Sequence, residues 1–387
     1  MVFVGGQMMA QGGYDEVLRQ IEANNTTLAA LRQQVEANKI GYRTGLMPAN
    51  PEIEFNYLWG SPISIGNRQD VRITQSFDFP TAYSYRNKIA GLQNEGEEFA
   101  YKMERLSVLL SARENCVALV YYNALARAYA IRLQNAERIA ETYRIKLEKG
   151  EENILEHNKA QLNLASVQAE VAQIEAERSF LLLELERLNG GIGVDFSVDA
   201  YQPSPLPAHF EDWYAEVQSQ SPILQFVRSQ IDIGQQQVKL SRALSLPRLS
   251  AGYMSEKVVG EHFQGITVGI SVPLWENKNR VKEARALVRA SEYVYEDAKI
   301  QFYNRLKSLH FKAFAMQQSA QKVRQSLSAH GNEPLLKKAL DAGEISLLNY
   351  LLELEYYYDA LNKALEAERD YEFALSELNY PLLFKSN

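Results

Sequence analysis

The chain has 387 residues, of which 46% are hydrophobic and 23% charged, with a formal net charge of −7 and one cysteine. Cys116 alone cannot build a disulfide framework or a multi-cysteine zinc or iron–sulfur site. The acidic balance, without a basic cluster, argues against a nucleic-acid-binding protein, because a surface that tracks phosphates needs a basic excess. The sequence contains no run of about 18 apolar residues, which excludes a helical membrane span.

The chain opens with a short apolar stretch. Residues 1–13 are predicted to be a signal-peptide remnant that lacks its basic beginning, or a disordered start. A first repeat is predicted over residues 14–189, and it begins with a helix.

Short segments of alternating apolar and polar residues predict four strands. Two lie in the first half, at about 52–60 and 70–79, and two in the second half, at about 248–258 and 265–272. Each has about 8 to 11 residues, the length that a tilted strand needs to cross a bilayer. Pro80 and Pro273 end the two strand pairs, since proline lacks the N–H that a ladder requires.

A long helical hairpin is predicted after each strand pair. The two hairpins cover residues 82–189 and 275–380, and their apolar positions step by three and four. At about 1.5 Å per residue, a helix from Ala82 to about Lys149 would be roughly 100 Å long. The sustained seven-residue stepping, as at Leu347, Leu354 and Leu361, indicates left-handed coiled-coil packing.

The stretch between the two hairpins is rich in glycine and proline. Residues 190–212 are predicted to be a crossover linker with a short strand at Val194–Val198. The second repeat is predicted over residues 213–383.

An internal duplication relates the two halves at an offset of about 193 to 196 residues. Pro80 corresponds to Pro273, and Gly150 corresponds to Gly343. Each half reads helix, strand, strand, long helix, turn, long helix.

This duplicated order resembles the TolC-type outer membrane efflux protein family over almost the whole chain. The most specific local resemblance is at the two helical turns. Residues 343–351 (Gly-Glu-Ile-Ser-Leu-Leu-Asn-Tyr-Leu) are similar to the family's Gly-x-x-Ser-x-x-Asp-Val-Leu turn, and residues 150–156 are similar to its sister turn. Within the family, the chain is placed nearest the branch associated with RND pumps and heavy-metal efflux.

The resemblance implies a mainly α fold with membrane β structure. Three copies would form a homotrimer, in which each chain gives four strands to a 12-stranded outer-membrane β-barrel and long helices to a coiled-coil α-barrel in the periplasm. The trimer would be the passive exit duct of a tripartite efflux or type I secretion system in a Gram-negative bacterium. Its partners would be outer membrane lipid, a periplasmic adaptor (membrane fusion) protein and an inner-membrane pump, expected to be of RND type. No enzymatic activity and no cofactor are expected.

The resemblance also assigns roles to residues. The adaptor would contact the two turns, at Gly150, Glu151, Asn153, Gly343, Glu344 and Ser346. The candidates for the periplasmic gate are Glu156, Asn349, Leu352 and Glu353. Many relatives carry acids at the positions of Asn349 and Leu352, so an acidic gate here would need Glu353, Glu344 or Glu156 instead. The interfacial aromatic residues, expected at or near strand ends, are Tyr57, Trp59, Phe77, Phe79, Tyr253 and Trp275.

Other interpretations compete with these roles. Gly150 and Gly343 are also typical helix C-caps. The five histidines lack metal-ligand spacing, so no metal site is expected, and no catalytic constellation emerges. The alternative function is a periplasmic coiled-coil adaptor or scaffold, which would have short strands with polar faces and a separate β domain. A cytosolic coiled-coil structural protein is a third hypothesis, but it would not need prolines after alternating strands.

Overall fold

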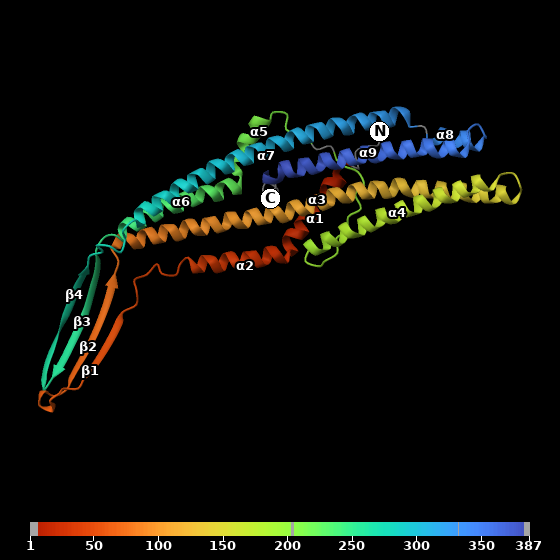
Figure 1. The fold of residues 1–387 in the computed structure, drawn as a ribbon. Helices are drawn as coiled ribbons and strands as arrows, with labels where there is room; N and C mark the ends of the chain where they lie inside the picture. Colours follow the sequence, from red (N-terminus) through yellow and green to blue (C-terminus); the bar gives the residue numbers. More distant parts are fainter. Residues whose placement is uncertain (1–6, 203–204, 332, 383–387) are drawn as a thin grey trace. The chain divides into compact units, whose positions relative to one another are not determined.

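The computed structural model describes residues 7–202, 205–331 and 333–382 (Figure 1). The helices are α1 (Gln7–Asn24), α2 (Thr26–Gly41), α3 (Pro80–Glu148), α4 (Ile154–Leu188), α5 (Phe210–Gln220), α6 (Pro222–Ala243), α7 (Arg280–His330), α8 (Glu333–Asp341) and α9 (Leu347–Asn379). The strands are β1 (Glu52–Leu58), β2 (Arg68–Phe77), β3 (Arg248–Val258) and β4 (Glu261–Ser271). No helix within those ranges is long and apolar enough to span a membrane.

The chain divides into two compact units, each built from segments that are distant in sequence. Unit 1 comprises the N-terminal segment up to Ala29, residues Glu104–Gln220 and the C-terminal segment from Phe302. Unit 2 comprises Ala30–Met103 and Ser221–Gln301, and it holds all four strands.

The four strands of unit 2 form one antiparallel sheet in the order β1-β2-β3-β4. The central pairing of β2 with β3 joins the two halves of the chain, with Ile73 opposite Tyr253. Strand β4 begins at Glu261, before the predicted 265, because a two-residue turn at Val259 and Gly260 connects it to β3. Both turn residues have positive φ, as a type I′ hairpin turn requires.

The segment before each strand pair contains two helices where one was predicted. Helix α1 ends at Asn24 and α2 begins at Thr26, and the amide N–H of Leu28 donates to Asn25 Oδ1 over 2.9 Å. In the second half, Ser221 caps α6, whose first residue is Pro222. Both capping residues are buried and accept a hydrogen bond from the new helix, so each break is the capped start of a second helix rather than a frayed end.

The start of the chain is helical where the structure describes it. Residues 7–13 belong to α1, which corrects the prediction of a disordered start for that part, and residues 1–6 lie outside the described residues. A Cβ at Gly13 would lie 3.1 Å from Val198 Cγ2, so glycine lets α1 approach the crossover closely.

The predicted strand at Val194–Val198 is wrong, because those residues carry no strand pairing. The segment is extended, and its alternate side chains Val194, Phe196 and Val198 pack on the main core of unit 1, which α1, α3 and α4 build. The ring of Phe196 lies 5.7 Å from that of Tyr14. Packing against helices therefore produces the same alternation as a strand.

The two predicted hairpins differ in their first arm. In the first hairpin α3 runs unbroken through 69 residues from Pro80, which occupies the first helical position where proline is tolerated. In the second hairpin, predicted from 275, α7 begins at Arg280, ends at His330 and is followed by the separate helix α8. The break lies just before Pro334. Proline has no N–H to bond the preceding turn, so it is tolerated in the first turn of a new helix but not in the interior of a continuous one.

Candidate functional site

The sheet of unit 2 has one mainly apolar and one mainly polar face, because the register places alternate residues on opposite faces. The apolar face carries Ile53, Phe55, Tyr57, Val71, Ile73, Phe77, Leu249, Tyr253, Ile266, Val268 and Ile270. Nothing in the described chain covers this face: Ile53 is 75% exposed, Ile266 85% and Val268 81%. An exposed apolar face of this size is a surface for lipid or for another protein.

The polar face carries charged residues that form ion pairs within β2 and between neighbouring strands. Arg68 Nε lies 2.8 Å from Asp70 Oδ1, and Arg68 Nη2 lies 3.2 Å from Glu256 Oε2 on β3. Arg72 on β2 lies 3.3 Å from Glu54 on β1. These pairs were not predicted from the sequence, although the charged residues occupy alternate positions of the predicted strands.

Both edges of the sheet are open in the described chain. Strand β1 pairs only with β2, and β4 pairs only with β3. An open edge presents a row of unpaired N–H and C=O groups that pair readily with another strand. The sheet therefore presents two surfaces that require partners, an apolar face and a pair of strand edges.

Five of the six predicted interfacial aromatic residues lie at or near the end of a strand. Tyr57 is next to last in β1, its hydroxyl accepts a hydrogen bond from Asn67 Nδ2, and its ring lies 5.5 Å from that of Trp59. Phe77 ends β2, while Phe79 and Trp275 follow the strands in sequence. All of these side chains are exposed.

Tyr253 differs from the expectation for an interfacial residue at a strand end. It lies in the middle of β3, between Ile73 and Ile266, and its hydroxyl donates to Gln264 Oε1 over 2.8 Å. The alternation predicts that Tyr253 lies on the apolar face, and it does. Its distance from the strand ends depends on where β3 begins and ends, which the alternation does not define.

The two helical turns of unit 1 have the same construction. Gly150 and Gly343 adopt φ of 72° and 75°, and their amides donate to Leu147 O and Leu340 O over 3.0 Å. The next residue donates over 2.9 Å in each turn, to the carbonyl of residue 146 or 339. This is the Schellman arrangement, so both glycines are helix C-caps.

The helix after each turn is capped three residues beyond the glycine. Asn153 Oδ1 accepts hydrogen bonds from the amides of Leu155 and Glu156, over 2.8 and 3.1 Å. Ser346 Oγ accepts from the amide of Asn349 over 3.2 Å. The predicted contact residues Gly150, Glu151, Asn153, Gly343, Glu344 and Ser346 are all exposed, so capping does not bury them.

A shared core joins the two turns. Ile139, Tyr143 and Ala160 of the first hairpin pack with Leu347, Tyr350, Leu354 and Tyr358 of α9. Burial, followed by the charges of Glu152 and Glu156, raises the pKa of the Tyr143 hydroxyl. The same packed core therefore supports both predicted contact turns.

The gate candidates fall into two groups. Glu156 forms an ion pair with Lys159 over 2.7 Å and is partly buried. Asn349, Leu352 and Glu353 are exposed on α9, and Asn349 and Glu353 share one face at a spacing of four residues. Glu353 has no hydrogen bond or ion pair with the side chains in the described ranges, so its charge is available to a solute.

The described residues contain no group of three or more His, Cys, Asp or Glu side chains arranged to hold a metal ion. Cys116 is buried, and burial raises the pKa of its thiol to about 12. A thiol of this kind is unreactive.

The chain matches no protein-family model and no curated protein. Solved structures are similar to it over nearly its whole length. The outer-membrane channel OprN has a TM-score of 0.79 and 14% identity, with 96% of this chain and 90% of that chain covered. The outer membrane protein VceC from Vibrio cholerae has a TM-score of 0.76 and 14% identity, with 97% of each chain covered. The open state of the Neisseria gonorrhoeae MtrE outer membrane channel has a TM-score of 0.76 and 17% identity, with 96% and 88% covered. The fold predicted from the sequence is therefore confirmed.

Proposed function

We propose that this chain, which has the fold of the TolC-type outer membrane channels, forms the outer membrane exit duct of a tripartite efflux or secretion system. The observation that carries the proposal is the amphipathic sheet with two open edges. Its apolar face fits the hydrocarbon of a bilayer, and its polar face of paired charges fits a water-filled lumen.

Closure of the sheet demands several copies of the chain. Within a bilayer an unsatisfied N–H or C=O costs several kcal/mol, so an open strand edge does not persist there. Four strands cannot close on themselves, because the smallest known outer membrane barrels have about eight. In the proposed homotrimer, β4 of one copy pairs with β1 of the next, which gives a barrel without edges.

The helices support the same assembly. Helix α4 carries Leu155, Leu162 and Leu183 exposed on one face, at spacings that are multiples of seven, with Ala169 and Ala176 between them. A heptad stripe of this kind packs against another helix. We propose that a neighbouring copy supplies that helix and so closes a periplasmic α-barrel.

The remaining roles follow from this assignment. The turns at Gly150 and Gly343 dock a periplasmic adaptor, which connects the duct to an inner-membrane pump of RND type. Glu353 supplies the negative charge at the constriction, since Glu156 is neutralised by Lys159. The chain acts by conduction and carries out no chemistry.

The test is to extract the full chain from membranes in mild detergent and measure its mass and shape. The proposal expects outer membrane fractionation, about three chains of 44.0 kDa per particle and a tube of more than about 100 Å. In planar bilayers the particles should conduct ions. A monomer recovered without detergent would refute the duct and favour the periplasmic scaffold instead.

A further inference from the structure

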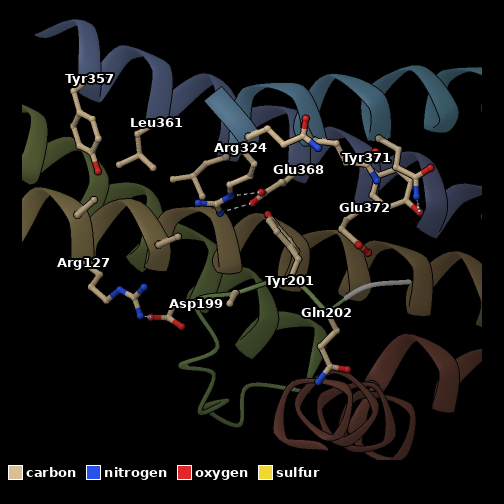
Figure 2. Close-up of a pocket in the computed structure, with 18 of the residues that line it drawn as sticks. Arg127, Asp199, Tyr201, Gln202, Arg324, Tyr357, Leu361, Glu368, Tyr371 and Glu372 are labelled. Atoms are coloured by element: carbon tan, nitrogen blue, oxygen red, sulfur yellow. Dashed lines mark hydrogen bonds and ion pairs between the residues drawn. The ribbon is translucent and has the colours of Figure 1, made fainter. Parts of the chain in front are cut away.

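Unit 1 contains a groove of about 1120 Å³ that the proposed duct does not use (Figure 2). Its walls are residues 124–131 of α3, residues 199–202 and Pro205 of the crossover, residues 317–325 of α7 and residues 357–372 of α9. This is the size of groove that holds a drug-sized ligand.

The charges in the groove leave one carboxylate without a partner. Arg324 binds Glu368 through two hydrogen bonds, of 2.6 and 2.9 Å, and Arg127 lies 2.7 Å from Asp199. Each arginine is thus neutralised by an acid (Figure 2). Glu372 is the remaining charged residue of the lining, so the groove carries one net negative charge when this residue is ionised.

Glu372 is buried, with 5% of its surface exposed. Among the described residues, no hydrogen bond or ion pair reaches its carboxylate. Arg113 attracts it from a longer distance, but the guanidinium Nε of Arg113 donates to Ser376 Oγ over 3.1 Å and its carbon lies 5.8 Å from the centre of the Tyr14 ring. A buried carboxylate without a partner gains free energy when a cation enters beside it.

The rest of the lining is suited to an organic body rather than to a metal ion. It includes the tyrosines Tyr201, Tyr357 and Tyr371, the amides of Gln202, Gln317, Gln321 and Gln325, and the aliphatic Ile131, Leu361 and Leu365. Tyrosine rings attract organic cations through their negative faces. A metal ion, in contrast, requires several oxygen or nitrogen ligands.

We propose that this groove binds an organic monocation with an apolar or aromatic body, and that Glu372 is its counter-ion. The site lies within one unit of a single chain, so it needs no residue of a second copy.

The proposed site predicts a pH dependence of binding. Burial raises the pKa of Glu372 to about 7, while Arg113 lowers it and Glu368 raises it. The titratable and charged groups around it are Tyr14 of α1, Arg113 of α3, Tyr201 of the crossover, Arg324 of α7, and Glu368 and Tyr371 of α9. A cation binds the ionised carboxylate, so its affinity should fall about tenfold between pH 8 and pH 6.

The test uses the full chain in nanodiscs of zwitterionic lipid and titrates tetraphenylphosphonium calorimetrically, with empty nanodiscs subtracted. We expect saturable binding of one cation per chain, with proton release near pH 7. Tetraphenylborate has the same shape and the opposite charge, and it should not bind saturably. Glu372→Gln should weaken cation binding at least tenfold and remove its pH dependence.

Two further variants keep the test decisive. Gln321→Trp fills the groove from the exposed face of α7 and should weaken binding even if Glu372→Gln fails to fold. Glu114→Gln changes a half-buried acid of α3 outside the groove and should bind like the wild type. Absence of saturable binding by the wild type, or equal binding by wild type and Gln321→Trp, would overturn the proposal.

Discussion

Replacing Glu372 with glutamine should raise the heat stability of the protein, and by more at pH 8 than at pH 5. Burial raises the pKa of this carboxyl from its ordinary value of 4.5 to about 7. The folded protein therefore holds the proton more tightly than the unfolded chain does. By linkage, stability is lost as the pH rises from about 4.5 to about 7, and the full loss persists above pH 7.

The magnitude follows from the difference between the two pKa values. Each unit corresponds to about 1.4 kcal/mol, so the ionised carboxylate costs about 3 kcal/mol at pH 8 and about 1 kcal/mol at pH 5. The side chain is 5% exposed, so solvent screening removes little of this cost. The glutamine variant does not ionise, and its advantage over the wild type should grow by about 2 kcal/mol between pH 5 and pH 8.

The assay is thermal unfolding of the detergent-solubilised assembly, followed by intrinsic fluorescence at both pH values. Glu355→Gln, on the exposed side of the same helix, is the matched control and should shift the melting temperature equally at both pH values. An advantage of Glu372→Gln that is equal at pH 5 and pH 8 would contradict this expectation, because it would show that ionisation of Glu372 costs the fold nothing.

Three further changes test the duct. Gly343→Pro removes the amide that donates to Leu340 and should abolish export while trimers persist; unchanged resistance in cells that carry the pump would contradict the adaptor contact. Ile266→Lys on the apolar face should cost about 2 to 4 kcal/mol and reduce the trimers in the outer membrane, whereas Thr267→Lys on the polar face should be tolerated. Glu353→Gln should weaken cation block of single channels, and Glu156→Gln should change it less; equal effects would remove Glu353 from the gate.

Features that depend on neighbours along the chain were predictable from the sequence alone. Alternation located the four strands, because successive side chains of a strand point to opposite faces. The matched glycines Gly150 and Gly343 located both turns, because the positive φ of a helix C-cap is a local requirement that glycine meets. The duplication then supplied the order of the elements, and with it the fold.

Features that join distant segments became visible in the three-dimensional fold and not before. Residues 194–198 alternate like a strand, but helices α1, α3 and α4 offer a packing surface and no strand edge. The pair between Arg68 and Glu256 exists because β2 and β3, from opposite halves of the chain, lie side by side. In the sequence, Glu372 does not differ from the other acidic residues of a solvated helix. The fold buries it and places no partner beside its carboxylate. Burial and charge pairing depend on residues brought together from the whole chain, and no local pattern encodes them.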